Sequence, residues 1–336
     1  MLQQTQVKTV IPFWNRWMTE LPTIEAAANA SSDKLHKLWE GLGYYTRVRN
    51  LQKAAQVIVE KHDGIFPEKF DDILALPGIG RYTAGAICSI AFNQPAPILD
   101  GNVIRVLTRV FGIAENPTEK KSNARLWQLA EELVAHANTQ GTQRITIPAF
   151  AVSAALRDNV SCSFLNQSLM ELGALVCTPR NAQCLICPVK KLCVAFKENR
   201  VDELPNLGKR EAATARHFTA FVVERDGKFL VQQRPSGVVN AHLWEFPNME
   251  ITGTKLDAEA AFQKLFSLKP KTLQPLCLVK HSITRYRITL EAFIVALKRT
   301  DGPAAGDWKT PAQMETLAFT SAHRKVLRAL AARAGR

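Results

Sequence analysis

The sequence lacks the long apolar run that a membrane-spanning helix needs. Its 336 residues contain no stretch of about eighteen apolar residues, so we expect no transmembrane segment and no membrane partner. The first residues, MLQQTQVKTVIPFW, also lack the charged, then apolar, then small pattern of a secretory signal. No internal repeat or low-complexity tract is present, which excludes repeat and fibrous architectures.

Acidic residues are in the minority. The chain has 30 Asp and Glu against 43 Lys and Arg, which gives a net charge of +13 and a pI of about 9.5. A basic excess of this size favours a polyanionic partner, most often nucleic acid or an acidic membrane surface. A soluble protein that is merely basic is the plain alternative.

Cysteine is scarce except in one place. Four of the seven cysteines lie within seventeen residues, in the pattern C-x6-C-x2-C-x5-C. This clustering argues against a disulfide framework and for a reducing cytoplasm. The clustered residues are Cys177, Cys184, Cys187 and Cys193, and the scattered ones, which we expect to be buried thiols, are Cys88, Cys162 and Cys277.

Four thiolates in one short loop are ligands for zinc or for an iron–sulfur cluster. A zinc ribbon usually brings two tight pairs together across a longer loop. Here a single CxxC pair is flanked by lone cysteines, and Pro188 would stiffen the loop. The spacing therefore favours a 4Fe–4S cluster, with zinc and unligated thiols as the alternatives.

The residue pattern changes along the chain. Residues 1 to about 195 show apolar spacing of three and four, as in Ser32–Leu42 and Arg49–His62, which predicts helices. From His217 the pattern is strand-like, with a hairpin signal at Asp226-Gly227 and a strand at Arg285–Leu297. Residues 198–216 show no clear period and read as a linker. A basic helix with a Ser cap ends the chain at Ser321–Gly335.

Two segments of the helical part carry chemistry. In LPGIGRYTAGAI, Gly78 and Gly80 lie between two helical patterns, and glycine there lets backbone N–H groups approach an anion beside a helix N-terminus. This is the pattern of a helix–hairpin–helix that grips DNA phosphate without reading sequence. An ordinary turn between helices with glycine caps is the plain alternative.

Asp100 stands at the entrance of a second helix, about twenty residues after the glycine hairpin. Its plain interpretation is an N-cap worth about 1 kcal/mol. Beside a DNA clamp, however, its carboxylate could face the oxocarbenium ion that develops at a deoxyribose. The buried face of this helix is expected at Val103, Val106, Leu107 and Val110.

These elements, in this order, resemble the helix–hairpin–helix base-excision DNA glycosylases, and within them the MutY-type adenine glycosylases. MLQQTQVKTVIPFWNRW resembles the first DNA-contacting helix of that family, and WEGLGYYTRVRNLQKAA its second signature. The segments LWEFPN and LAFTSAHRKVL resemble its MutT-like C-terminal domain. The resemblance covers nearly the whole chain.

The resemblance implies a multidomain protein with an all-α core and an α+β MutT/Nudix-like domain. We expect a six-helix-barrel lobe with the helix–hairpin–helix at 1–95, and a helical lobe with the iron–sulfur loop at 96–197. The linker at 198–216 would be followed by the Nudix-like, lesion-recognising domain at 217–336. Residues 138–160 read as an insertion to which the sequence assigns no role.

The resemblance also assigns roles to residues. Asp100 takes the electrostatic or nucleophilic role at C1′, with Asn102 supporting it, and Tyr44 matches a tyrosine that wedges beside 8-oxoguanine. Arg47, Arg49 and Arg105 are candidate phosphate contacts or, equally, solvated surface charges. The expected DNA-contacting residues are Gln3, Gln4, Thr5, Tyr44, Gly78, Gly80, Tyr82, Asn102 and Thr284.

The chain departs from the family in several places. Where endonuclease III has a lysine nucleophile, this chain has Tyr82, so we expect no Schiff base and no strand cleavage. The family's general-acid glutamate would fall two places before Met1, so either the start is misassigned, which we favour, or the gene is truncated. The family's Phe-Ser-His lesion loop aligns with Ile283-Thr284-Arg285. Acids that would form a Nudix box after Asn248 are missing, so that domain should bind rather than hydrolyse.

The sequence therefore predicts a monofunctional adenine DNA glycosylase with a 4Fe–4S cluster, acting in base excision repair. Its partner would be double-stranded DNA carrying an adenine·8-oxoguanine or adenine·guanine mispair. We further expect a monomer, associated with the nucleoid in a bacterial cytoplasm. A lesion-binding protein without catalysis and an endonuclease III-like glycosylase/lyase for oxidised pyrimidines are the alternatives.

The net charge generates a prediction about DNA affinity. Several phosphate contacts should make binding strongly salt-dependent, with a loss of roughly 10³-fold between low and moderate salt. Fluorescence anisotropy of a labelled duplex across a salt series measures this loss. An affinity that does not change with salt would contradict the electrostatic interpretation.

Overall fold

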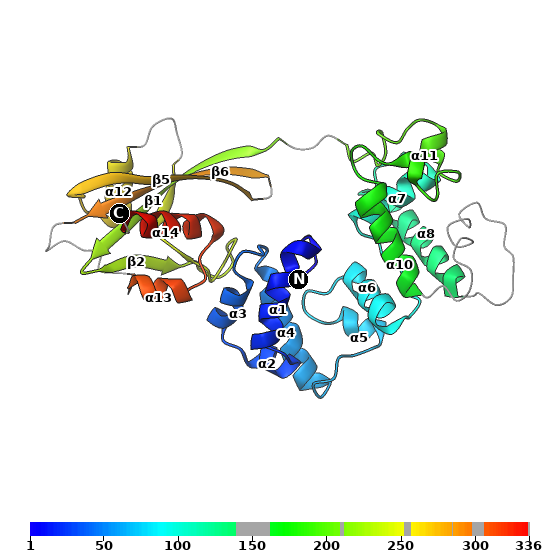
Figure 1. The fold of residues 1–336 in the computed structure, drawn as a ribbon, viewed down its shortest axis with the longest axis horizontal. Helices are drawn as coiled ribbons and strands as arrows, with labels where there is room; N and C mark the ends of the chain where they lie inside the picture. Colours follow the sequence, from blue (N-terminus) through cyan, green and yellow to red (C-terminus); the bar gives the residue numbers. More distant parts are fainter. Residues whose placement is uncertain (139–161, 209–211, 252–256, 284, 298–305, 335–336) are drawn as a thin grey trace. The chain divides into compact units, whose positions relative to one another are not determined.

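The computed structural model describes residues 1–138, 162–208, 212–251, 257–283, 285–297 and 306–334 (Figure 1). Nearly all of the predicted insertion at 138–160 lies outside the described residues, as does Thr284. The chain divides into two compact units, Met1–Gly64 with Glu211–Arg336, and Ile65–Arg210. The expected lobe boundary at residue 95 falls inside the second unit, and the domain assignment stays a prediction.

The first unit begins with four helices around an apolar core. Trp17 and Trp39 meet edge to face in this core, with ring centroids 6.0 Å apart. Side-chain caps at Thr23 and Ser31 fix where two of the helices start. The four helices are α1 (Val7–Glu20), α2 (Ile24–Asn29), α3 (Ser32–Trp39) and α4 (Thr46–Lys61).

The rest of the first unit is a mixed β-sheet with three helices. The strand order is β3-β2-β1-β6-β5, with β4 also on β1 and β7 also on β2; β1 and β6 are parallel and the other pairs antiparallel. The strands are β1 (Thr214–Arg225), β2 (Lys228–Gln233), β3 (Trp244–Glu245), β4 (Asn248–Ile251), β5 (Thr272–Ile283), β6 (Tyr286–Ala296) and β7 (Asp307–Lys309), and the helices α12 (Ala258–Phe266), α13 (Pro311–Thr316) and α14 (Ser321–Ala334).

The sheet is buried on both faces, which explains the unbroken apolar run in β1. Ala220 and Val222 share a core with Val326 of α14, whereas Phe221 shares one with Phe262 of α12. Successive strand residues point to opposite faces, so a strand covered on both sides reads as continuously apolar. The predicted hairpin is confirmed, because Asp226 and Gly227 both have positive φ between β1 and β2.

Polar contacts join the N-terminal helices to the β-sheet domain within the first unit. The Glu40 carboxylate accepts a 2.9 Å hydrogen bond from the Phe319 N–H, and the Lys37 ammonium donates to the Leu317 carbonyl at 2.9 Å. The Arg49 guanidinium donates to the Ala241 carbonyl at 3.1 Å. These bonds join residues that are 192 to 280 positions apart in the sequence, and they explain why the two segments form one unit.

The second unit is helical. Its main core lies between α7, α8 and α10, and a smaller core lies under α5 and α6. A π-helical turn and the cysteine loop complete it. Its helices are α5 (Phe70–Leu74), α6 (Arg81–Phe92), α7 (Gly101–Phe111), α8 (Lys120–Asn138), α10 (Cys162–Glu171), the π-helical η2 (Leu172–Val176), the 3₁₀ turn η3 (Cys184–Ile186) and α11 (Val194–Lys197).

One expectation about a single residue needs correction. Cys88 and Cys162 are buried as predicted, but Cys277 is only half-buried. Within the segment predicted as a linker, Leu204 is 2% exposed and its carbonyl accepts a hydrogen bond from Arg109. The all-α part followed by an α+β domain is confirmed. Within the described ranges, no helix is long and apolar enough to cross a membrane.

His323 of α14 is a buried histidine held neutral. It is 4% exposed, and its Nδ1 accepts a 3.1 Å hydrogen bond from the Phe246 N–H. Burial lowers the pKa of His323 to about 3, with Arg234 and His281 acting in the same direction. The Glu245 carboxylate lies 3.9 Å from Nε2, but it is already paired with Arg234.

This histidine should make stability depend on pH. Between the unfolded pKa of 6.5 and the folded pKa of about 3, only the unfolded state binds the proton. The free energy of unfolding should therefore fall by about 1.4 kcal/mol for each pH unit below 6.5. Urea unfolding of the full chain from about pH 7.5 down to about pH 5 measures this slope above the carboxylate range. His323→Gln removes the titrating group, so an equal slope in this variant would disprove the assignment.

Candidate active site and cysteine loop

The predicted glycine hairpin is a tight turn between α5 and α6. Gly78 has φ +80°, a left-handed conformation that favours glycine. Gly80 is the N-cap of α6 with φ −99°, so its backbone does not require glycine. No side chain caps α6, which leaves the positive end of the helix open to an external anion.

A close backbone approach holds α6 against the segment that leads to Asp100. A Cβ on Gly85 would lie 2.1 Å from the Pro97 carbonyl oxygen, so only glycine fits there. This contact fixes the hairpin and the start of α7 relative to each other within the second unit. The sequence motif includes Gly85, but sequence reasoning gave it no role.

Asp100 is the N-cap of α7, as the sequence predicts. Its Oδ1 accepts a 2.8 Å hydrogen bond from the Val103 N–H, and its Oδ2 accepts one of 3.1 Å from the Asn102 amide. Both carboxylate oxygens are thereby held while the side chain stays half-exposed. Of the predicted apolar face, Val103, Val106 and Leu107 are fully buried.

Arg105, one turn further along α7, is 8% exposed. It donates to the Asn102 side-chain oxygen at 2.9 Å, and to the carbonyls of Gly173 and Cys177 at 2.7 Å each. Burial lowers the pKa of this guanidinium. A chain of hydrogen bonds thus runs from the Asp100 carboxylate through Asn102 and Arg105 to the backbone of the cysteine loop.

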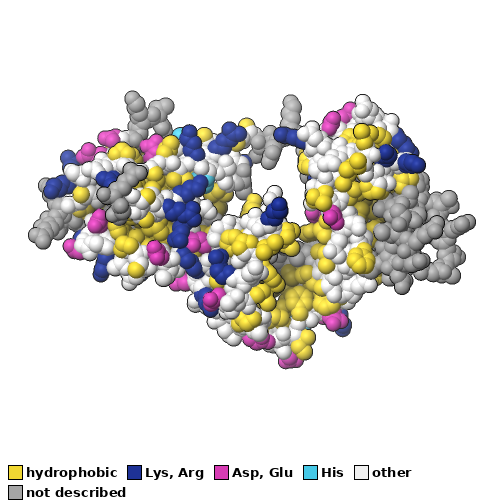
Figure 2. Space-filling view, in the orientation of Figure 1, with side chains coloured by type: hydrophobic (Ala, Val, Ile, Leu, Met, Phe, Trp, Pro, Cys, Tyr) yellow, Lys and Arg dark blue, Asp and Glu magenta, His cyan; other side chains and the backbone are white. Residues whose placement is uncertain are grey.

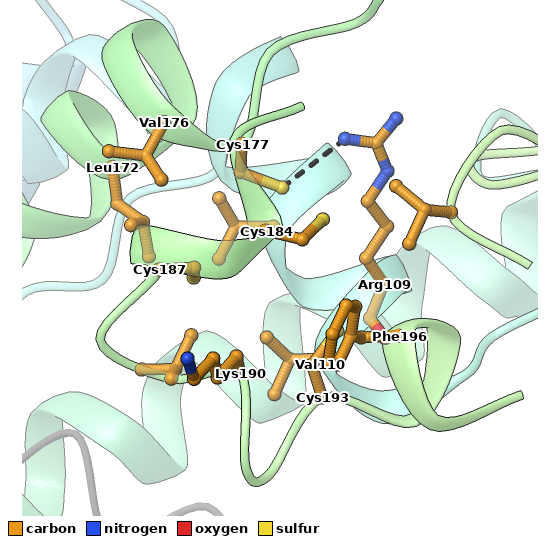
Figure 3. A pocket seen from close by; sticks show the side chains of 13 residues that line it. Arg109, Val110, Leu172, Val176, Cys177, Cys184, Cys187, Lys190, Cys193 and Phe196 are labelled. Atoms are coloured by element: carbon orange, nitrogen blue, oxygen red, sulfur yellow. Dashed lines mark hydrogen bonds between the residues drawn. The ribbon is translucent and has the colours of Figure 1, made fainter. Parts of the chain in front are cut away.

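Arg109 repeats this arrangement one turn later and is 2% exposed. Its guanidinium donates to the carbonyls of Leu204 and Thr178 at 2.8 Å each and to the Cys177 sulfur at 3.3 Å (Figure 3). The Cys193 thiol in turn donates to the Arg109 carbonyl at 3.3 Å. Both ends of the cysteine loop are therefore tied to α7.

The four clustered cysteines line one cavity, as the sequence pattern predicts. Figure 3 shows Cys177, Cys184, Cys187 and Cys193 around a common space, with Arg109 beside Cys177. Burial and the neighbouring thiols raise the pKa values of Cys184, Cys187 and Cys193. Apolar side chains supply most of the remaining lining: Val106, Val110, Leu172, Val176, Val189, Phe196 and Val201.

The donor chemistry fits a metal centre with soft ligands. Four thiols around an apolar space can hold zinc or an iron–sulfur cluster. A tetrahedral zinc site needs four sulfurs at about 2.3 Å from one point, whereas a cubane binds each thiolate to a different iron and spaces them further apart. In the described part of the chain, no three His, Cys, Asp or Glu side chains are arranged to hold one metal ion.

Tyr82 is the second residue of α6 and is half-buried. Its hydroxyl donates to the Met170 sulfur at 3.4 Å. Burial raises the Tyr82 pKa, and the Asp100 carboxylate raises it further. The group beside Asp100 is therefore a neutral phenol, which cannot form a Schiff base.

The first unit holds the other predicted DNA-contacting residues. Gln4 and Tyr44 both have positive φ, +57° and +48°, and the Tyr44 side chain is 57% exposed. Arg47 joins the two segments, since its guanidinium donates to the Gln3 carbonyl and to the Thr5 hydroxyl.

The structure therefore gathers the predicted residues in two groups, one in each unit. Gln3, Gln4, Thr5 and Tyr44 lie around Arg47. Asp100 and Asn102 lie at the start of α7, with Tyr82 of α6 close enough to feel the Asp100 charge. Sequence reasoning missed Arg109 and misread Arg105 as a candidate phosphate contact. Their spacing of four places both arginines on one side of α7, away from the apolar face of Val103, Val106, Leu107 and Val110, so the helical pattern gave no signal of their burial.

Two family models match the chain. Residues 1–132 match the HhH-GPD superfamily of base excision DNA repair proteins, and residues 219–329 match the NUDIX domain. Among solved structures, the chain is similar to a thermostable thymine-DNA glycosylase, with TM-score 0.47 and 25% identity over 59% of this chain and 80% of that one. It is also similar to the MutT NUDIX hydrolase of Burkholderia pseudomallei, with TM-score 0.30 and 17% identity over 35% of this chain and 98% of that one.

Curated relatives match both parts together. The chain is 34% identical to the adenine DNA glycosylase of Rattus norvegicus, over 98% of this chain and 69% of the relative. It is 33% identical to that of Homo sapiens, over 98% and 66%, and 35% identical to that of Buchnera aphidicola subsp. Schizaphis graminum, over 74% and 65%. The chain thus spans about two thirds of the length of these relatives. With the helix–hairpin–helix, the capped aspartate and the Nudix-like sheet in one polypeptide, the chain belongs to the adenine DNA glycosylase family of base excision DNA repair enzymes.

Proposed function

We propose that this chain removes adenine mispaired with 8-oxoguanine or guanine from double-stranded DNA by hydrolysing its N-glycosidic bond. The observation that carries the proposal is the Asp100 carboxylate, held by two hydrogen bonds at the entrance of α7 beside the glycine hairpin. The N-glycosidic bond is inaccessible inside a duplex, so the adenine must be flipped out of the base stack.

The proposed chemistry follows from what each group can do. As the bond to adenine lengthens, positive charge develops at C1′ of the sugar, and the Asp100 carboxylate stabilises it. Asn102 orients the carboxylate by donating to Oδ2, and Arg105 fixes Asn102. Water then adds at C1′. Because Tyr82 carries no amine, the abasic product keeps its strand intact and the enzyme is monofunctional.

Adenine is a poor leaving group unless its ring is protonated, so the reaction needs a general acid. In residues 1–336 the first acidic side chain is Glu20, near the far end of α1 from Gln3 and Gln4. The resemblance places the family's glutamate two residues before Met1. A glutamate at that position would supply the proton.

DNA would be bound at several places. The open N-terminus of α6 and the Gly78–Gly80 turn suit a phosphate, and Lys and Arg side chains lie on the face of the first unit drawn in Figure 2. Gln4 and Tyr44 would enter the base stack, flanked by Gln3 and Thr5. Thr284, between β5 and β6, would contact the oxidised base, and the Nudix-like domain would bind without hydrolysing.

We further propose that Cys177, Cys184, Cys187 and Cys193 hold a 4Fe–4S cluster. Such a cluster, when bound, cross-links its loop and withdraws the four thiolates from protonation. It takes no part in the hydrolysis. The protein's own contribution is the pair Arg105 and Arg109, which tie the loop to the helix that Asp100 begins.

The first experiment compares three chains on an adenine·8-oxoguanine duplex: residues 1–336, the same residues preceded by Ser-Glu-Val, and that longer chain with Asp100→Asn. The longer chain should excise adenine, and residues 1–336 should be slower by roughly 10²–10⁴-fold. Asp100→Asn keeps the helix cap, so it should abolish turnover and leave duplex binding nearly unchanged. Single-turnover assays with and without alkali report excision and strand cleavage separately.

The control substitution is Glu132→Gln, an exposed acid on α8 whose side chain accepts a hydrogen bond from Gln128; it should match the parent. Full activity of residues 1–336 would show that another residue supplies the acid. Binding without excision in all chains would favour the lesion-binding alternative. A borohydride-stable adduct would favour the lyase alternative.

The cluster proposal is tested by metal content. Anaerobically purified chain should contain about four iron atoms per polypeptide, with the broad visible absorbance of sulfur-to-iron charge transfer. Cys187→Ser should lower the iron content and the thermal stability together, whereas Cys88→Ser, at a buried thiol outside the loop, should keep the iron. Stoichiometric zinc without iron would refute the cluster.

A further inference from the structure

Arg47 of α4 joins two irregular segments of the first unit. Its Nη1 donates to the carbonyls of Met1, at 2.8 Å, and Gln3. Its Nη2 donates to the carbonyls of Leu42 and Gly43, at 3.3 Å each, and to the Thr5 hydroxyl, also at 3.3 Å. Nη1 thus donates to the segment before α1, and Nη2 donates mainly to the loop before α4.

Two aromatic rings hold the guanidinium in this place. Its central carbon lies 5.3 Å from the ring centroid of Trp39 and 5.7 Å from that of Tyr44. Trp39 is fully buried and donates from its indole nitrogen to the Gly43 carbonyl at 3.1 Å. Burial lowers the Arg47 pKa. The Arg47 guanidinium is therefore bound within the protein and is not a solvated surface charge available to a DNA phosphate.

Each of the two joined segments contains a residue in an unfavourable backbone conformation. Gln4 has φ +57° and Tyr44 has φ +48°, and side chains other than glycine rarely adopt such angles. Strain of this kind persists only where the surroundings enforce it. Here the carbonyls and the hydroxyl that surround Gln4 and precede Tyr44 are the acceptors of Arg47.

We propose that Arg47 is a positioning residue that holds Gln4 and Tyr44 in their left-handed conformations, so that both side chains meet the DNA as a preformed pair. The inference rests on the proposed function, because it takes the insertion of these side chains from there. A preformed pair loses little conformational entropy on insertion, which favours the damaged duplex over undamaged DNA. A guanidinium is required because its two terminal nitrogens donate to different segments, whereas the single ammonium of lysine cannot reach both.

The test uses the full chain with Arg47→Lys, Arg47→Ala and the control Arg16→Lys. Arg16 is also a guanidinium beside an aromatic ring, 5.0 Å from the Phe13 centroid, and donates to the Leu38 carbonyl at 2.9 Å. This hydrogen bond goes to α3, outside both segments. The probe is a duplex with 2-aminopurine next to an adenine·8-oxoguanine mispair, whose fluorescence rises when a side chain unstacks the neighbouring base.

With the parent and Arg16→Lys, the fluorescence should rise on binding. With Arg47→Lys the rise should be lost, and affinity for the mispaired duplex should fall about 10-fold, while affinity for undamaged duplex changes less than about 2-fold. Arg47→Ala should behave in the same way. The slope of log affinity against log salt should be unchanged in both variants, because no phosphate contact is removed.

Three results would overturn the inference. If the Arg47→Lys variant kept the fluorescence rise of the parent, a single positive charge would be enough to hold the two segments. A salt slope lowered by about one in Arg47→Ala would identify a phosphate contact instead. Equal losses of affinity for the mispaired and the undamaged duplex would indicate a structural role only.

Thermal unfolding identifies a variant that does not fold. If Arg47→Ala does not fold, the comparison is made with Arg47→Lys alone. If the parent chain itself gave no fluorescence rise on binding, the proposed insertion of Gln4 and Tyr44 into the duplex would be wrong. This result requires only binding, so it can be obtained even from a chain that does not excise adenine.

Discussion

The second unit depends on two arginines buried in α7. A buried charge is costly unless its hydrogen bonds are made, yet within the described residues Arg105 and Arg109 donate no hydrogen bond to a carboxylate. They use backbone carbonyls, at Gly173, Cys177, Thr178 and Leu204. A hydrogen bond to a charged group contributes about 1.5–3 kcal/mol, so each arginine makes several segments of irregular backbone energetically dependent on α7. The π-helical turn, the cysteine loop and the start of the predicted linker are all held in this way.

In the first unit, too, an arginine donates hydrogen bonds to backbone carbonyls of separate segments, but there it holds different residues in place. Irregular backbone carries carbonyls that no helix or strand satisfies, and a guanidinium with five donors can collect them from separate segments. In α7 this ties down a loop of potential metal ligands. At Arg47 it ties down exposed residues that would enter DNA. In both places a guanidinium that sequence reasoning offered as a phosphate contact is already occupied inside the protein.

The sequence predicts local features well, because their causes are local. The Asp100 cap, the Asp226-Gly227 hairpin and the glycine turn before α6 each follow from a few neighbouring residues. The common cavity of the four cysteines follows from their short spacing. Interactions across long separations were not accessible: nothing near Arg109 in the sequence indicates Leu204, and nothing near Glu40 indicates Phe319. The roles of Arg47 and Arg105 depend on such distant carbonyls, which have no side-chain signature.

Asp100 also has a consequence for how this family can change over time. Catalytic groups are commonly a burden on folding, so their removal often stabilises a protein. A carboxylate that caps a helix does the opposite and contributes about 1 kcal/mol to the folded state. At position 100 the demands of folding and of the proposed chemistry therefore favour the same side chain. A substitution at position 100 by a residue that cannot cap the helix would therefore reduce both stability and activity, whereas Asn would keep the cap and remove only the negative charge.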